Sequence, residues 1–156
     1  MRLFSLLDRL VLALLGAALV MLVGVGGTQI VLRETVGTPL PWATEFSVVL
    51  MIWATMLSGY VGVRRNSHLS ADFLGLSLSE RRRRVLRTAS LLLSLLFVVI
   101  YGWQSFVVID AMEGIPFTSL PITQPVLYLS LPVGAVLMAL ALLERLWRDL
   151  CAEVPL

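Results

Sequence analysis

Hydrophobic residues along this chain gather in four long, uninterrupted runs. The runs cover residues 10–32, 46–63, 88–109 and 123–143, and each holds 18 to 23 residues. None of them contains Asp, Glu, Lys, Arg or His. A helix needs roughly 20 apolar residues to cross the hydrocarbon core of a bilayer, so the pattern predicts four transmembrane helices. Helices rather than strands are expected, because the runs are continuous and lipid offers no partner for unpaired backbone groups.

The predicted spans are residues 10–32, 42–63, 88–109 and 123–143, with Trp42 in the first turn of the second span. The chain, residues 1–156, is therefore expected to form a single four-helix transmembrane domain, an all-α integral membrane fold. Arg2 and Arg9 precede the first run as they would in a signal peptide. That run is longer than the roughly 7 to 15 residues of a signal sequence, which indicates a retained anchor.

Composition agrees with a membrane protein and excludes other classes. Of the 156 residues, 58% are hydrophobic and 14% are charged, which is too apolar for a soluble domain and the opposite of a disordered chain. The sequence contains one cysteine, Cys151, and one histidine, His68. These counts exclude a disulfide scaffold, a Cys/His zinc site and bis-histidine haem ligation within the chain. We therefore expect no metal and no cofactor.

The basic residues predict an orientation. All 12 are arginines, and with four spans 11 of them fall at the two termini and in the loop between the second and third spans. The remaining one, Arg33, lies in the first loop. By the positive-inside rule both termini are cytoplasmic. The loop before the fourth span, which carries Asp110 and Glu113, then faces outward.

The arginine-rich loop has two further features. Ser79 followed by Glu80 is typical of a helix start, so the third helix is expected to begin near Glu80. Leu69, Phe73 and Leu76 recur at helical spacing, which favours a short interfacial helix between the second and third spans. The run Arg81–Arg84 precedes a span directly, so we interpret it as holding topology and meeting anionic lipid headgroups rather than nucleic acid.

Residues suited to catalysis or ion transport are mostly absent from the apolar runs. Ionisable groups within a membrane mark proton relays, ion paths and substrate counter-charges, and the four apolar runs have none. We recognise no Ser/His/Asp arrangement, carboxylate pair, glycine-rich phosphate loop or metal-ligand spacing, and so expect no catalytic residue and no enzyme. The small and mildly polar residues of the spans favour helix packing. Pro132, inside the fourth span, predicts a kink there, because it removes one helical hydrogen bond.

A few residues near the span ends remain as candidate contact residues. Glu45 is either an acid in the first turn of its helix, with Trp42 in the aromatic belt, or a contact to a partner subunit or to Arg33. His68, with Arg64 and Arg65, is either a general interfacial cluster or a specific lipid or subunit contact.

The order of residues resembles a known family. Residues 41–45 read Pro-Trp-Ala-Thr-Glu, Trp53 follows, and residues 64–69 read Arg-Arg-Asn-Ser-His-Leu, with Asp72 and Leu74 beyond them. Later come residues 119–122, Ser-Leu-Pro-Ile, then Tyr128 and residues 131–134, Leu-Pro-Val-Gly. Together these are similar to the small membrane subunit of tripartite ATP-independent periplasmic (TRAP) transporters, the DctQ family. Ser58 stands where that family often has glycine, which shifts Gly59 by one place.

The resemblance implies a three-part importer of the bacterial inner membrane. A periplasmic solute-binding protein captures a carboxylate or related acid, and a large membrane subunit moves it with an ion gradient. The small subunit braces the immobile part of the large one. On this resemblance Trp42 and Glu45 help set the periplasmic end of the small subunit. The cytoplasmic end is fixed by Arg64, Arg65, His68 and Asp72.

Three other readings stay open at this point. A stand-alone four-helix exporter needs a membrane-embedded carboxylate, which the first span lacks. A haem or quinone anchor of a respiratory complex survives only without bis-histidine haem in this chain. The small subunit of a different tripartite carboxylate importer would have much the same pattern.

Overall fold

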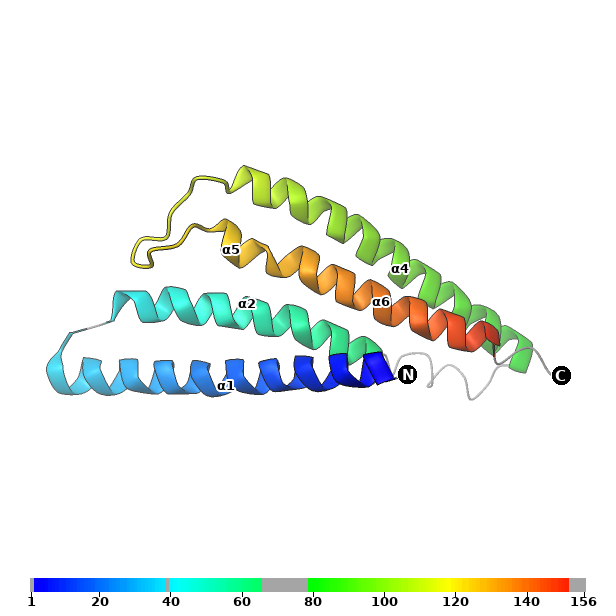
Figure 1. Cartoon of the computed structure of the whole chain (residues 1–156), viewed down its shortest axis with the longest axis horizontal. Helices are drawn as coiled ribbons and strands as arrows, with labels where there is room; N and C mark the ends of the chain where they lie inside the picture. Colours follow the sequence, from blue (N-terminus) through cyan, green and yellow to red (C-terminus); the bar gives the residue numbers. More distant parts are fainter. Residues whose placement is uncertain (1, 39, 66–78, 152–156) are drawn as a thin grey trace.

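The computed structural model describes residues 2–38, 40–65 and 79–151. Its helices are α1 (Arg2–Val36), α2 (Pro41–Arg64), α4 (Glu80–Ala111), α5 (Pro125–Tyr128) and α6 (Ser130–Cys151), as Figure 1 shows. Four helical stretches are long and apolar enough to cross a membrane, which confirms the predicted number of spans. The predicted interfacial helix, His68 and Asp72 lie outside the described residues.

Local sequence accounts for most helix ends. α1 stops before Gly37, whose φ of 71° lies in the left-handed region that favours glycine. Pro41 then occupies the first position of α2, where its missing N–H costs nothing. α4 begins at Glu80, as predicted, after an extended Ser79 that makes no side-chain capping hydrogen bond. Several helices run beyond the apolar runs: α1 begins at Arg2, and α6 continues to Cys151.

The last span is interrupted. Leu129 separates α5 from α6, although its own φ and ψ are helical. Pro132 has no N–H to donate to the carbonyl of Tyr128, and this missing bond lies at the interruption. The interruption at Leu129 lies three residues before Pro132, and the kink expected from Pro132 stays a prediction.

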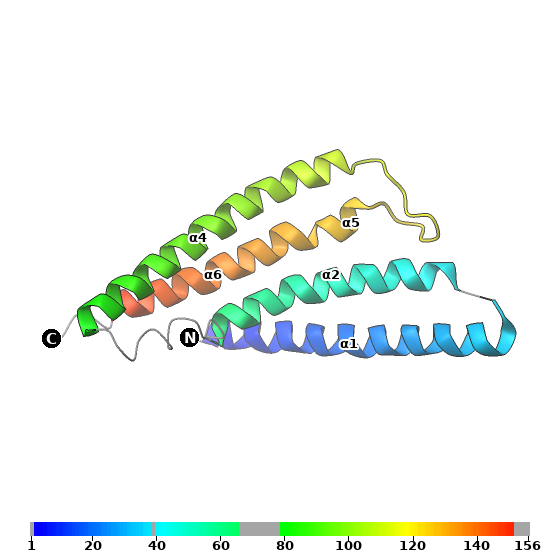
Figure 2. The ribbon, with the colours of Figure 1, turned by 180° about the vertical axis from the view of Figure 1, so that it is seen from behind.

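The helices form a single layer rather than a closed bundle. Among the described residues α1 packs only on α2, α2 packs on α6, and α6 packs on α4. The order across the layer is therefore α1, α2, α6, α4, which the two ribbon views show from opposite sides (Figures 1 and 2). α6, the last long helix in the sequence, lies between two helices made before it.

Small residues let α6 approach its neighbours. A Cβ built on Gly134 would lie 2.9 Å from Cβ of Met56 on α2. One built on Gly59 would lie 2.9 Å from Sδ of Met138 on α6, and one on Gly102 would lie 3.2 Å from Cβ of Ala135. Gly59 thus faces α6 while the neighbouring Ser58 is exposed. The close approach of α2 to Met138 is thus made at Gly59 and not at Ser58.

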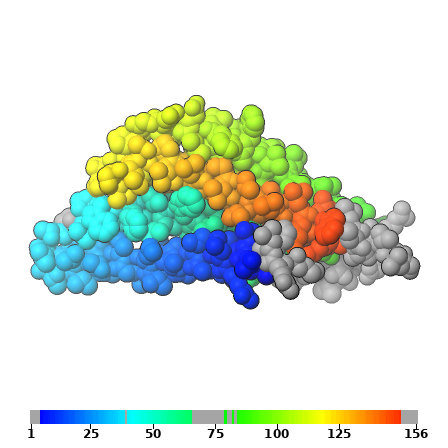
Figure 3. Space-filling model, viewed as in Figure 1, coloured from blue at the N-terminus to red at the C-terminus, as the bar shows by residue number. Residues whose placement is uncertain are grey.

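The buried core is thin, and most of the apolar surface is uncovered. Among the 18 most apolar consecutive residues of each span, 39% are buried in the α5–α6 span and only 6% in α1. The space-filling view shows α1 and α4 along opposite edges of the layer (Figure 3). Lipid or another membrane protein is needed to cover such faces. The largest fully buried side chains are Tyr60, Val11 and Ser130.

The candidate contact residues that the structure describes lie at the two ends of the layer. The Arg64 end is where α1 and α4 begin and α2 and α6 finish, at the right of Figure 1. The Glu45 end is the opposite one, where α2 begins and the connection from α4 to α5 turns.

Candidate functional site

Arg64 joins three helices at the Arg64 end. Its guanidinium donates from Nε to Oδ1 of Asp8 at 3.0 Å and from Nη2 to Oδ2 of Asp8 at 2.7 Å. Its Nη1 donates to Oε2 of Glu144. Because these carboxylates lie on α1 and α6, the last residue of α2 links both neighbours of its helix. The two parallel bonds to Asp8 are the fork geometry in which arginine and carboxylate pair most strongly.

Two more side chains complete this network. The Tyr60 hydroxyl, one turn before Arg64 on α2, donates to Oδ1 of Asp8 at 2.6 Å. Arg148, one turn after Glu144 on α6, donates from Nη2 to Oε1 of Glu144. We call Asp8, Tyr60, Arg64, Glu144 and Arg148 the Arg64 network.

The centre of the Arg64 network is shielded from solvent, whereas the side chains of Asp8 and Arg148 at its edges are 34% and 54% exposed. The side chains of Arg64 and Glu144 are 19% and 8% exposed, and Tyr60 is fully buried. A charge with so little water around it is tolerated only when it is paired and hydrogen-bonded. Each carboxylate here accepts bonds at both oxygens. The network is therefore suited to fixing three helices relative to one another rather than to moving a proton.

A second ion pair lies at the same end. Arg87 on α4 donates from Nη2 to Oδ1 of Asp149 on α6. The other carboxylate oxygen of Asp149 is buried without a hydrogen-bond partner. Together with the Arg64 network, this pair places a charged contact on both sides of α6.

Glu45 organises the opposite end. Its Oε1 accepts a hydrogen bond from the backbone N–H of Thr118 at 2.9 Å. Its Oε2 accepts from the N–H groups of Ser119 at 2.9 Å and Leu120 at 3.0 Å. One side chain in the first turns of α2 thus holds three consecutive backbone donors of the connection between α4 and α5. Three charge-assisted bonds make this the principal attachment of that loop to α2.

The loop held by Glu45 has order of its own. Pro116 and Thr123 form an isolated antiparallel bridge, with Phe117 N donating to Ile122 O at 3.1 Å. The loop leaves α4 through Gly114, whose φ of 79° favours glycine. Of the two partners considered for Glu45 from sequence, Arg33 instead pairs with Glu34, its Nη2 lying 3.1 Å from Oε1.

Two tryptophans of α2 make further contacts, Trp42 at the Glu45 end and Trp53 farther along the helix. Trp42 packs edge-on against Phe46, with ring centroids 6.3 Å apart, and remains 41% exposed. Trp53 donates from Nε1 to the carbonyl of Val126 at 3.3 Å, which ties α2 to α5. The exposed part of Trp42 is amphipathic and is free for lipid or another protein, as expected of an aromatic belt residue.

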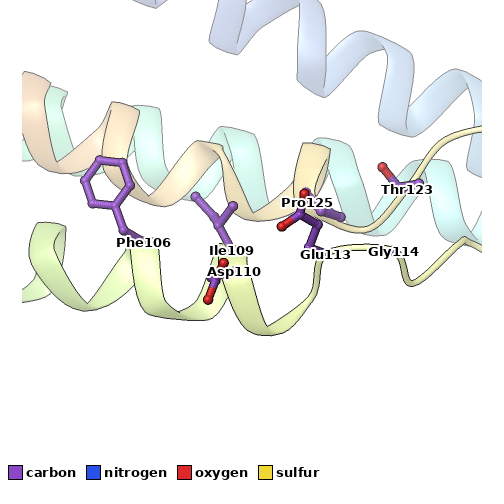
Figure 4. A pocket seen from close by; sticks show the side chains of 7 residues that line it. All are labelled: Phe106, Ile109, Asp110, Glu113, Gly114, Thr123 and Pro125. Atoms are coloured by element: carbon purple, nitrogen blue, oxygen red, sulfur yellow. The ribbon is translucent and has the colours of Figure 1, made fainter.

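A pocket of about 620 Å³ lies beside this loop. Its lining residues come from α4, from the connection between α4 and α5 and from the start of α5, and Figure 4 labels them: Phe106, Ile109, Asp110, Glu113, Gly114, Thr123 and Pro125. The described part of the chain holds no group of three or more His, Cys, Asp or Glu residues suited to a metal ion. We assign no chemistry to this pocket.

Comparison with known proteins identifies the family. Residues 22–152 match the family model described as "Tripartite ATP-independent periplasmic transporters, DctQ component". The chain belongs to the DctQ family. It is a small-subunit component of the TRAP type, which confirms the resemblance stated from the sequence, and it has four helices suited to spanning a membrane. DctQ is a transporter component and not an enzyme family.

A curated relative of this DctQ-family chain is the sialic acid TRAP transporter permease protein SiaT of Haemophilus influenzae (strain 86-028NP). The two are 30% identical over 132 residues, which cover 79% of this chain and 20% of the relative. The chain thus spans about a fifth of the length of that permease, so the relative contains a large further part with no counterpart here.

The structure brings together some of the residues singled out in this DctQ-family sequence. Trp42 and Glu45 lie on the first turns of α2, and Arg64 and Arg65 lie at its other end. His68 and Asp72 fall outside the described residues. Sequence reasoning missed Asp8, Tyr60 and Glu144. Two features of the sequence could have indicated them. Glu144 lies four residues before Arg148, a common spacing for ion pairs on a helix. Asp8 is a charged residue directly before an apolar run.

Proposed function

We propose that this chain is the small permease subunit of a TRAP transporter and that it braces the large membrane subunit. The large subunit and a periplasmic solute-binding protein together carry out ion-gradient-driven uptake of a carboxylate-type solute. Membership of the DctQ family is the observation that carries the proposal. The TRAP permease relative, five times as long as the matched region, supports a larger membrane partner.

Two properties of the chain support bracing rather than transport. The four apolar runs contain no ionisable residue on which a travelling ion or acid could rest. The single layer leaves long apolar faces uncovered, and α1 packs on only one of the other described helices. A layer fixed by ion pairs at one end and by Glu45 at the other suits a scaffold. Selectivity for the solute then resides in other subunits.

Orientation in the bacterial inner membrane is part of the proposal. The arginine distribution supports cytoplasmic termini and an arginine-rich cytoplasmic loop with an interfacial helix. The Arg64 end is then cytoplasmic and the Glu45 end periplasmic. We propose Trp42 and Glu45 as contact residues at the periplasmic end. At the cytoplasmic end we propose Arg64, Arg65, His68 and Asp72, together with anionic lipid headgroups.

Co-purification and transport test the proposal together. An affinity-tagged chain expressed from its native operon is expected to retain a larger membrane protein in mild detergent. Vesicles with the chain alone are expected to be inert, whereas vesicles with both membrane subunits accumulate solute only with its binding protein and an ion gradient. Gradient-driven accumulation by the chain alone would contradict the bracing role.

A further inference from the structure

A small surface pocket lies at the Arg64 end, between the ends of α1, α2 and α6. Its volume is about 280 Å³, and its lining residues are Asp8, Leu12, Val61, Arg64, Arg65 and Arg148. This is below the roughly 300 to 1,000 Å³ of most small-molecule sites, so the pocket fits a single polar group rather than a whole metabolite. Three of the six lining residues are arginines.

Charge in and around the pocket does not balance. Asp8 and Glu144 supply two negative charges, both bonded to arginines of the Arg64 network. Arg65 makes no side-chain hydrogen bond or ion pair with any part of the chain that the structure describes, and its side chain is exposed. With Arg64, Arg65 and Arg148 the group carries one net positive charge. A single monoanion beside Arg65 would neutralise it.

The wall of the pocket specifies where that anion comes from. Leu12 and Val61 line the side nearest the spans, and Leu12 is 41% exposed. An acyl chain attached to the anion can lie along these side chains and continue over the exposed face of α1. A free phosphate in water gains nothing from such a wall. Basic pockets between transmembrane helices at the cytoplasmic boundary are also suited to anionic lipid headgroups.

We propose that this pocket is a specific binding site for the phosphate of an anionic phospholipid. Arg65 supplies the unpaired charge, and Arg64 and Arg148 supply the rim. A zwitterionic lipid is disfavoured because both carboxylates near the pocket are already bonded to arginine, which leaves no counter-charge for its ammonium group. The proposal rests on the orientation given under the proposed function, since the pocket must lie at headgroup depth, but it does not depend on transport.

Native mass spectrometry of the full-length chain, with any subunit that accompanies it, tests the site. The probes are phosphatidylglycerol, phosphatidylcholine and sn-glycerol 3-phosphate. We expect phosphatidylglycerol to bind best, and Arg65→Gln to weaken its binding about fivefold, the effect of one arginine near a membrane surface. Arg33→Gln is the matched control: it removes the same charge in the last turn of α1, at the opposite end of the layer, and should leave binding unchanged.

Several outcomes would overturn the assignment. Equal loss in the Arg65→Gln and Arg33→Gln variants would mean that only net charge matters. Phosphatidylcholine or sn-glycerol 3-phosphate binding as tightly as phosphatidylglycerol would remove the anionic lipid as the ligand. If Arg65→Gln lowered the yield of the large subunit while phosphatidylglycerol binding stayed constant, the pocket would belong to a protein contact. Failure of the chain to co-purify with a larger membrane protein, with phosphatidylglycerol binding intact, would count against the proposed function and not against this site.

Discussion

Arg64 and Asp8 are 56 residues apart in the sequence and form a two-pronged ion pair, with nitrogen-to-oxygen distances of 3.0 and 2.7 Å. The same guanidinium reaches Glu144 on a third helix. Arg64 thus forms ion pairs with carboxylates on both helices that flank α2. The relative positions of α1, α2 and α6 therefore depend on this side chain.

Replacing Arg64 by alanine should destabilise the layer strongly. The change removes the positive charge that the carboxylates of Asp8 and Glu144 share. Removing one partner of a buried ion pair costs about 3 kcal/mol or more. The free energy of unfolding can be measured by SDS titration in mixed micelles. Arg33→Ala is the control, because Arg33 and Glu34 are both more than 60% exposed and such a pair contributes less than about 1 kcal/mol. Equal stability of the two variants would contradict the role given to Arg64.

Glu45→Ala should release the loop between α4 and α5 without preventing membrane insertion. The backbone amides of Thr118, Ser119 and Leu120 lose their acceptor, and each charge-assisted bond contributes about 1.5 to 3 kcal/mol. Hydrogen exchange of a peptide that contains these three amides should become at least about tenfold faster. Glu113→Ala removes a nearby charge whose side chain makes no hydrogen bond or ion pair with the described residues, so it should leave exchange as it was. Unchanged protection in the Glu45 variant would show that the loop is held by its own bridge instead.

Glycine-to-alanine changes should form a graded series. Gly134→Ala meets Cβ and backbone of Met56, so it should cost about 1 to 3 kcal/mol of stability. Gly59→Ala meets the flexible end of Met138 and should cost less. Gly62→Ala has nothing within 4 Å and should be neutral or slightly stabilising, because alanine favours helix. Thermal unfolding in detergent ranks the three variants, and a Gly134 variant as stable as the Gly62 variant would argue against the α2–α6 packing.

Labelling of cysteine checks the orientation. Cys151, the only cysteine, should react with a membrane-impermeant maleimide in inverted vesicles and not in intact spheroplasts. A matched variant combines Cys151→Ser with Ser119→Cys, which places the thiol on the exposed loop of the Glu45 end. That variant should show the reverse pattern. Reaction of Cys151 from outside would invert the proposed topology.

Much of the helical structure could be predicted because lipid imposes a simple rule. Each apolar run had to become a helix, and Glu80 was identified as the start of α4 from one cap residue and one acid. The helix ends beyond the runs were harder. Asp8 was missed because the first run was defined by the absence of charge, whereas a charged residue can lie in the same helix when it is paired.

Arrangement across the layer could not be predicted from the same patterns. In lipid every apolar face is equally acceptable, so periodicity does not tell an open layer from a closed bundle. The partners of Arg64 lie 56 and 80 residues away, and those of Glu45 lie 73 to 75 residues away. Such pairings need the helix order, and nothing local in the sequence specifies it.

The position of α6 between α2 and α4 has a consequence for biosynthesis. A ribosome delivers this segment last, after both of its flanking neighbours are already in the bilayer. α2 and α4 must therefore stay apart, or separate again, before α6 can insert between them. Arg64 can pair with Asp8 as soon as α1 and α2 are inserted, whereas its bond to Glu144 forms only when α6 arrives. Nascent chains that stop short of α6 should consequently persist as two unjoined halves, and quality-control proteases of the membrane would meet them in that state.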